Sequence, residues 1–121
     1  MFGHLSHIEK LRAAGGQIDG ARLAGGGSRS PVWSQMFADA IQVPMEVPDG
    51  KELGTRGAAL SAGIGAGIYH DYAEAVQEAV SVVRIHEPNP VNTPFYLARY
   101  AEYQRLVSVM KEPWEELNKL N

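Results

Sequence analysis

Apolar residues recur at helical spacing along much of the chain, and glycines or prolines separate the helical stretches. Residues 4–14 predict a helix that Gly15 and Gly16 end, with one apolar face formed by Leu5, Ile8 and Leu11. Residues 31–42 predict a second helix, and its broad apolar stripe consists of Val32, Trp33, Met36, Phe37, Ala40 and Ile41. We expect this stripe to pack on a sheet.

The second half of the chain again predicts mostly helices. Residues 51–68 are rich in glycine, alanine and serine, and each internal glycine costs a helix about 1 kcal/mol relative to alanine. We therefore expect another element to pack closely against this helix. A helix over 72–83 and an extended segment over 84–91 follow. Thr93-Pro94 then caps a long last helix that kinks or restarts at Pro113.

Two short segments predict strands, over 18–24 and 43–47, and Pro44 and Pro48 bound the second. Two strands do not form an independently stable sheet. Either these strands pair with another chain, or the chain is the end of a larger α/β domain whose remaining strands lie upstream. Exposed strand edges would also favour self-association into a homo-oligomer.

Length and composition limit the possible functions. The 121 residues, 45% of them hydrophobic, suffice for about one domain with a modest core. A net charge of -3 with scattered Lys and Arg gives no support for binding to nucleic acid or to an anionic membrane. The lack of cysteine excludes disulfides, thiolate metal sites and thiol catalysis. No segment predicts a membrane span or a signal peptide, so we expect a cytoplasmic protein.

The segment Leu23-Ala24-Gly25-Gly26-Gly27-Ser28-Arg29-Ser30-Pro31 carries the candidate chemistry. It predicts a strand that enters a glycine turn and then a helix, with Ser30 as N-cap and Pro31 at the first helical position. Glycines lack a Cβ, so a ligand can approach the backbone N–H groups of Gly25, Gly26 and Gly27 closely. The positive end of the helix dipole favours an anion at the same place. The segment therefore predicts a phosphate site.

This glycine loop does not match either standard phosphate motif. No Gly-Lys-Ser/Thr follows it, and Ser30 stands where a Gly-x-Gly-x-x-Gly motif has its third glycine. The alternative interpretation is that the glycines serve only a tight strand-to-helix turn. The rest of the sequence has to decide between the two interpretations.

Several blocks, in order, resemble the C-terminal portion of the FGGY carbohydrate kinases, which include xylulokinase, L-ribulokinase and glycerol kinase. The blocks are residues 22–35, Ala38-Asp39, residues 43–48, and Glu52 with residues 57–62. The resemblance extends from about Leu11 to Asn121. It implies an α/β fold with few strands and flanking helices, the C-terminal part of an actin-like, ribonuclease-H-like ATPase domain. Residues 1–121 would then be the nucleotide-binding part of the second kinase domain, without the catalytic first domain.

The same resemblance implies ATP or ADP, with Mg²⁺, as the cofactor. It places Gly26 and Gly27 on the phosphate and ribose side of the nucleotide and Ser30 at the adenine end, where glycerol kinase has asparagine. Gly25 and Ser28 complete the loop. The catalytic aspartate, most sugar contacts and the magnesium loops of family members lie upstream of the matching region, so no catalytic residue or metal ligand is predicted here.

The implied reaction transfers the γ-phosphate of ATP to a sugar or polyol hydroxyl, with the sugar bound through the missing domain. Residues 51–59 resemble xylulose kinases more than glycerol kinases, which favours a pentulose such as xylulose. We predict that the chain alone is not an active kinase, because phosphoryl transfer needs both sides of the cleft. A non-catalytic nucleotide- or anion-binding module and an oligomerising α/β module are the alternatives.

For the other candidate ligands and nucleotide contacts, the sequence mostly favours structural roles. The histidines His4, His7, His70 and His86 have no carboxylate motif beside them, so a metal site is not favoured. For Asp39, packing is favoured over a contact to magnesium through water. Packing is also favoured over stacking on adenine for Tyr96, Tyr100 and Tyr103. Arg29 either reaches a phosphate or remains solvated, and helix 54–67 either approaches the nucleotide or packs on the sheet.

Overall fold

A computed structural model describes residues 1–120, and Asn121, the last residue of the predicted domain, lies outside the described residues. The strands are β1 (Ala21–Arg22), β2 (Met45–Pro48) and β3 (Val82–His86). The helices are α1 (Phe2–Ala13), α2 (Pro31–Ile41), α3 (Leu53–Gly65), α4 (Tyr72–Ala79), α5 (Thr93–Val109) and α6 (Lys111–Asn118). A short 3₁₀ helix, η1, covers Gly26–Arg29. The predicted α/β architecture, with few strands and flanking helices, is confirmed.

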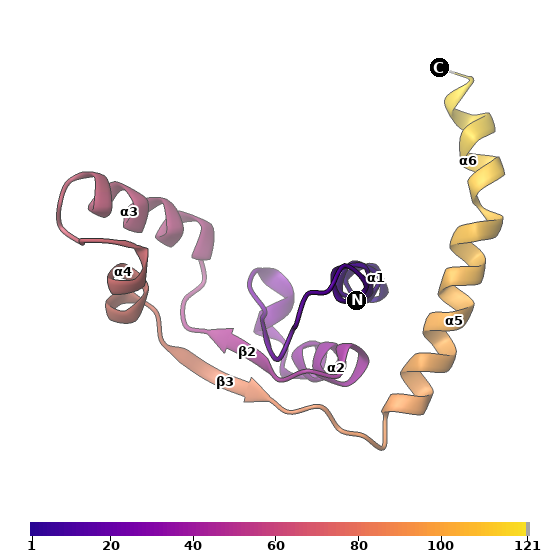
Figure 1. Cartoon of the computed structure of the whole chain (residues 1–121), viewed down its shortest axis with the longest axis horizontal. Coiled ribbons are helices and arrows are strands. Elements are labelled where there is room, and N and C mark those ends of the chain that lie inside the picture. The colour runs from indigo at the N-terminus through magenta and orange to yellow at the C-terminus, as the bar shows by residue number, and fades with distance from the viewer. Residues whose placement is uncertain (121) are drawn as a thin grey trace.

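One sheet joins the strands in the order β1-β2-β3, and β2 and β3 lie side by side in Figure 1. β1 is parallel to β2, with Ala21 opposite Met45, and β3 is antiparallel to β2, with Arg84 opposite Val47. The prediction of two strands is therefore wrong, since the chain near residue 84 forms a third strand. Alternating apolar and polar residues along β3 explain the strand, because successive side chains point to opposite faces.

Two predicted boundaries beside the sheet are also wrong. The predicted strand over 18–24 is reduced to the two residues of β1. The predicted helix over 72–83 ends at Ala79, and Val80 is already extended, with φ -127° and ψ 120°. β-branched valines favour a strand at that point, and pairing with β2 adds to this preference.

The glycine pair after α1 ends that helix as predicted. Gly15 has a φ of 89°. The N–H of Gly15 donates to the carbonyl of Arg12, and the N–H of Gly16 donates to the carbonyl of Leu11. This pattern is a Schellman motif, in which a left-handed glycine satisfies the last carbonyls of a helix.

The C-terminal helix restarts as predicted near Pro113. α5 ends at Val109, α6 begins at Lys111, and Pro113 lies in the first turn of α6, where a missing N–H costs least. The predicted cap at Thr93-Pro94 is one residue too late. Asn92 precedes α5, and Thr93 and Pro94 are its first two residues.

The hydrophobic core lies where α1, α2, β2 and α5 meet. Its buried residues are Leu5, Phe37, Ala38, Ile41, Val43, Met45 and Tyr100. The ring of Phe2 lies 5.7 Å, centroid to centroid, from the rings of both Tyr100 and Tyr103. Tyr96 is buried as well. The tyrosines of α5 therefore pack against neighbouring elements, as predicted.

The prediction of a closely packed neighbour for α3 is confirmed at Gly63, where an added Cβ would lie 3.0 Å from the ring of Tyr69, and is wrong for other glycines of this helix within residues 1–120. A Cβ added at Gly54, Gly57 or Gly65 would meet no atom within 4 Å. Only Leu60 and Gly63 of this helix are buried. The predicted apolar faces elsewhere are also only partly buried, and the exposed members are Leu11, Val32 and Trp33.

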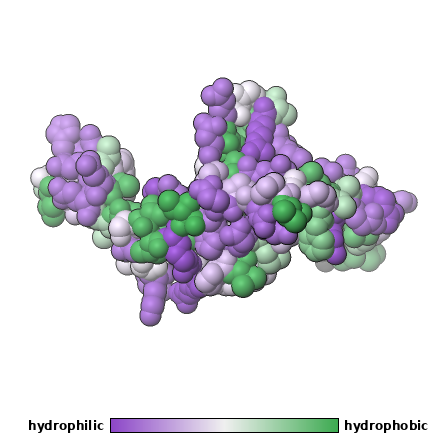
Figure 2. Space-filling view, turned by 90° about the horizontal axis from the view of Figure 1, so that it is seen from below, coloured by the Kyte–Doolittle hydropathy of each residue, from purple (hydrophilic) through white to green (hydrophobic). Residues whose placement is uncertain are grey.

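The molecule is open in shape, with α3 and α4 on one side and α5 and α6 as an arm on the other (Figure 1). Apolar side chains gather in patches on the face shown in Figure 2. The exposed apolar residues include Val83 and Ile85 of β3, Trp114 and Leu117 of the arm, and Ile68 after α3. Among residues 1–120, no helix combines the length and apolar character needed to cross a membrane.

Candidate phosphate site

The glycine turn follows β1, but it does not lead straight into α2 as predicted. The 3₁₀ helix η1 separates the two. Of the three consecutive glycines only Gly25 has a positive φ, 87° with a ψ of -168°, a conformation essentially restricted to glycine. Gly25 is thus required by the turn itself, whereas Gly26 and Gly27 need a different explanation.

Gly26 and Gly27 present open backbone to solvent. Both are exposed, and a Cβ on either would meet no atom within 4 Å. The first N–H groups of a helix have no acceptor inside that helix. The N–H groups of Gly26 and Gly27 also donate to no other acceptor within residues 1–120. Neither the backbone conformation nor internal packing requires glycine here. The open N–H groups are therefore available to a ligand.

Ser28 and Ser30 hold the loop in shape. Ser28 is buried, and its Oγ and its N–H donate to the carbonyl of Gly25 at 2.7 and 3.1 Å. Ser30 is the N-cap of α2 as predicted, because its Oγ accepts from the N–H of Trp33 at 3.3 Å and Pro31 is the first helical residue. Both hydroxyls are thus used within the protein.

The loop lies at the carboxyl edge of the parallel strands β1 and β2, where ligands of α/β sheets bind. The glycine turn follows β1, and Asp49-Gly50 follows β2. A cavity of about 230 Å³ lies beside this loop, between the end of η1, the segment after β2 and β3, and Gly25, Gly26 and Gly27 do not line it. Its lining residues are Ser28, Arg29, Val47, Pro48, Asp49, Gly50, Val83 and Arg84.

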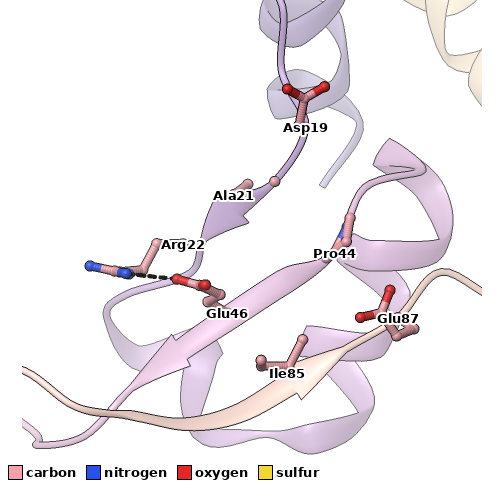
Figure 3. Close-up of a pocket in the computed structure, with 8 residues that line it drawn as sticks. Asp19, Ala21, Arg22, Pro44, Glu46, Ile85 and Glu87 are labelled. Atoms are coloured by element: carbon pink, nitrogen blue, oxygen red, sulfur yellow. Dashed lines mark hydrogen bonds and ion pairs between the residues drawn. The ribbon is translucent and has the colours of Figure 1, made fainter.

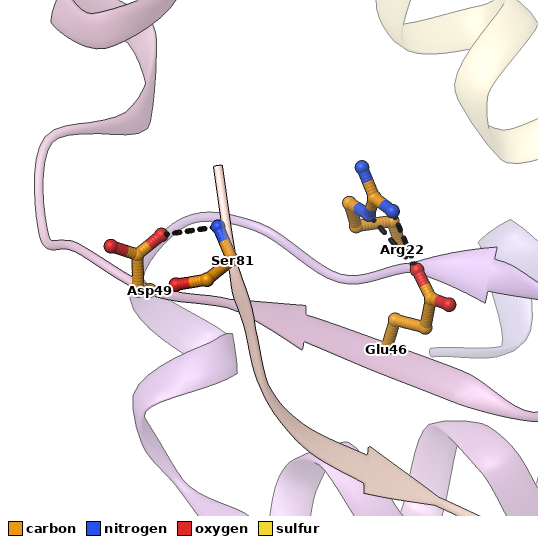
Figure 4. Close-up of polar contacts among 4 residues, drawn as sticks. All are labelled: Arg22, Glu46, Asp49 and Ser81. Carbon is orange, nitrogen blue, oxygen red and sulfur yellow. Dashed lines mark hydrogen bonds and ion pairs between the residues drawn. The ribbon is translucent and has the colours of Figure 1, made fainter. Parts of the chain in front are cut away.

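The charges around this cavity suit an anion. Arg29 is exposed, with its Nη2 3.8 Å from Glu52 Oε1. Asp49 is the carboxylate that lines the cavity, and Arg56 Nη1 lies 2.6 Å from its Oδ1. Hydrogen bonds from Arg56 and from the N–H of Ser81 lower the pKa of Asp49, and Figure 4 shows the Ser81 contact. Because Arg56 neutralises Asp49, the carboxylate does not repel a phosphate strongly.

Arg84, a residue that was not predicted from the sequence, connects β3 to the glycine loop. Its Nη2 donates to the carbonyl of Ser28. Its Nε is buried and has no hydrogen-bond partner within residues 1–120, and Arg84 forms no salt bridge in that part of the chain. The alternation of Val83, Arg84 and Ile85 was the available signal, since it places Arg84 on the opposite face from the two apolar residues.

Asp39 has the structural role that was favoured for it. Its buried carboxylate accepts hydrogen bonds of 2.8 Å from Gln35 Nε2, from the N–H of Asn89 and from Asn92 Nδ2. Burial raises the pKa of Asp39, but these hydrogen bonds outweigh burial and leave the pKa below its usual value. The network ties α2 to the segment between β3 and α5.

The histidines are distributed over different parts of the structure. His86 Nδ1 lies 3.1 Å from Gln35 Oε1, and the ring of His4 lies 5.6 Å from that of Phe37. Among residues 1–120, no group of at least three His, Cys, Asp or Glu residues could hold a metal ion.

A wider cavity, of about 450 Å³, opens on the opposite face of the sheet from α2 (Figure 3). Arg22 Nη2 lies 2.7 Å from Glu46 Oε2 at its edge, and Asp19 and Glu87 also line it. With these carboxylates outnumbering the one arginine, this cavity is a poor phosphate site. The glycine loop is the better candidate.

Comparison with known proteins identifies related sequences. Residues 1–66 match the family model described as the FGGY family of carbohydrate kinases, C-terminal domain. The chain is 33% identical to the L-xylulose/3-keto-L-gulonate kinase of Escherichia coli, over 92% of the chain and 22% of that protein. It is 36% identical to a probable L-xylulose kinase of Pasteurella multocida, with the same two coverages. The chain thus spans about a fifth of the length of these relatives.

A solved structure has the same fold. The xylulose kinase of Lactobacillus acidophilus superposes with a TM-score of 0.73 at 20% identity, over 84% of this chain and 21% of that one. This likeness confirms the fold that was expected from the sequence, an α/β arrangement of few strands with flanking helices.

Proposed function

The chain belongs to the FGGY family of carbohydrate kinases, and we propose that residues 1–121 form the C-terminal, nucleotide-binding part of the second domain of such a kinase. The match of residues 1–66 to the family's C-terminal domain supports this assignment. In this proposal the catalytic first domain lies outside residues 1–121. The exposed apolar surfaces of the sheet and of the C-terminal arm are then where other parts of the kinase pack.

The proposed site binds ATP or ADP at the glycine loop. The N–H groups of Gly26 and Gly27 bind the phosphates, Gly25 makes the turn, and Ser28 and Ser30 hold the loop and the start of α2. Ser30 lies at the adenine end. The observation that carries the proposal is the exposed backbone of Gly26 and Gly27, where neither the backbone conformation nor any contact within residues 1–120 requires glycine.

The proposed reaction of the whole kinase is transfer of the γ-phosphate of ATP to a sugar or polyol hydroxyl. The relatives named L-xylulose kinases favour a pentulose such as xylulose as the substrate. The sugar binds through the first domain, and such a kinase would act in the cytoplasm. Residues 1–121 by themselves bind nucleotide without transferring phosphate, because phosphoryl transfer needs both sides of the cleft and the first domain supplies the other side.

The residues near the loop fit a nucleotide better than they fit a bare metal ion. Open N–H groups and nearby arginines suit phosphate oxygens. Mg²⁺ prefers carboxylate and phosphate oxygens, and Asp49, the carboxylate lining the cavity, is held by Arg56. Mg²⁺ would therefore be held by the phosphates and by parts of the kinase beyond this chain, and this chain's own contribution is to orient the nucleotide.

Calorimetric titration of the purified chain with ADP and ATP, with and without Mg²⁺, tests the proposal. We expect weak, saturable binding of both nucleotides and no phosphate transfer to xylulose. Gly26→Val should abolish the binding while the helices remain folded, because the new side chain would fill the space that the phosphates need.

Gly57→Val is the matched control. A Cβ at Gly57 also meets no atom within 4 Å, and this position lies on α3. We expect the control variant to bind nucleotide like the wild type. Unchanged binding in the Gly26→Val variant would refute the site, and absence of any binding to the wild-type chain would refute the proposed function.

A further inference from the structure

We propose that Arg84 is a positioning residue for the nucleotide phosphates, acting through the carbonyl of Ser28. This inference rests on the nucleotide site proposed above and adds a residue outside the glycine loop. Arg84 comes from β3, 56 positions after Ser28, so the contact joins the far edge strand to the loop that follows β1.

The sheet register directs Arg84 toward the loop. Arg84 lies opposite Val47 in the antiparallel pair, and directly opposed residues share one face of a sheet. Val47 is buried. Arg84 therefore lies on the same face and reaches Ser28, while Val83 and Ile85 on either side of it are exposed. The alternation along β3 sets which side chain supports the loop.

The contact fixes the loop in two steps. Arg84 Nη2 holds the carbonyl of Ser28, and Ser28 in turn donates its Oγ and N–H to the carbonyl of Gly25. Hydrogen bonds with an ionised donor are roughly twice as strong as neutral ones. The orientation of the peptides that follow Gly25, and hence of the free N–H groups, depends on this connection.

The charge of Arg84 is uncompensated within the described chain. Arg84 is half-buried and forms no salt bridge within residues 1–120, whereas Arg22, Arg56 and Arg105 each have a carboxylate partner there. A partly desolvated cation without a counter-ion is costly. A phosphate at the glycine loop would supply the missing negative charge, so removal of Arg84 should weaken phosphate binding selectively.

The test compares ADP with adenosine, which has no phosphate, in titrations of the whole chain. We expect Arg84→Met to weaken ADP binding about tenfold, the equivalent of the charged-donor hydrogen bond that holds the carbonyl of Ser28, while adenosine binding stays the same. Arg84→Lys keeps the charge and should recover part of the ADP affinity. Arg105→Met removes an exposed arginine of α5 and should change neither affinity.

The ratio of the two affinities distinguishes positioning from general loss of structure, because misfolding would weaken both ligands together. An unchanged ratio in Arg84→Met would overturn the proposal for Arg84 and leave the nucleotide site intact. If the Met variant does not fold, Arg84→Lys decides by the same ratio. If the wild-type chain binds no ADP, the proposed function fails and Arg84 loses its role with it.

Discussion

The hydrogen bonds of Asp39 lead to a quantitative prediction about stability. Asp39→Ala removes a buried carboxylate that accepts hydrogen bonds from Gln35, Asn89 and Asn92. These bonds fasten the segment before α5 to α2, the helix that follows the glycine loop. The substitution should therefore loosen the junction of α2 with α5 as well as lower the overall stability.

The magnitude follows from the surroundings of the three donors. A hydrogen bond to a charged group contributes about 1.5–3 kcal/mol, but a donor that can turn to water recovers part of the loss. Asn89 is exposed, and Gln35 and Asn92 are half-buried, so each can be partly rehydrated. Counting about 1 kcal/mol for each bond gives a loss of about 3 kcal/mol in the free energy of unfolding. That loss is a large fraction of the stability of a small domain.

Urea unfolding of the wild type and the Asp39→Ala variant measures this difference. Asp19→Ala is the control, because Asp19 is exposed and forms no side-chain hydrogen bond within residues 1–120. Since the pKa of Asp39 is lowered by folding, its contribution is present above the ordinary aspartate pKa and is lost as pH falls through the lowered pKa. The difference in the free energy of unfolding between the wild type and the Asp39→Ala variant should therefore be full at pH 7 and smaller in acid. A loss below about 1 kcal/mol at pH 7 would refute the reasoning.

Three smaller changes test other contacts. Gly25→Ala should lower the free energy of unfolding in urea by about 2 kcal/mol. The φ of 87° alone causes this loss, because the new Cβ meets no atom within 4 Å. An unchanged free energy of unfolding would contradict the assigned turn. Ser30→Ala should lower the free energy of unfolding by about 1 kcal/mol, and with it the melting temperature, since the N–H of Trp33 loses its acceptor. An unchanged melting temperature would be evidence against the Ser30 cap. Burial and the hydrogen bond to Glu9 raise the pKa of Tyr100, so ultraviolet titration should show a phenol that ionises above the ordinary tyrosine pKa and is lost in Tyr100→Phe.

The sequence predicted the elements whose signals are local. The Gly15-Gly16 cap, the Ser30-Pro31 start of α2 and the restart at Pro113 each depend on a residue type with a specific backbone preference. The core tyrosines of α5 were also predicted, because their spacing places them on one helix face. The family was predictable as well, because several matching blocks follow one another in the same order along the chain.

Features that depend on distant partners were not predictable in the same way. β3 forms because it pairs with β2, and the helix predicted over 72–83 wrongly included its first two residues, Val82 and Val83. The contact between Arg84 and Ser28 depends on the order of three strands and on the sheet register, and neither leaves a local signal. The open face of α3 and the exposed Trp33 show the same limit, since periodicity identifies an apolar face but not the element that covers it.

The most direct test of the central claim is an NMR titration of the ¹⁵N-labelled chain with ADP, followed through the backbone amides. We expect the amide signals of Gly26 and Gly27 to shift most and to saturate together, while those of α3 glycines such as Gly57 stay in place. Saturable shifts centred elsewhere, or no shift at the glycine loop, would contradict the claim that this loop is the phosphate site.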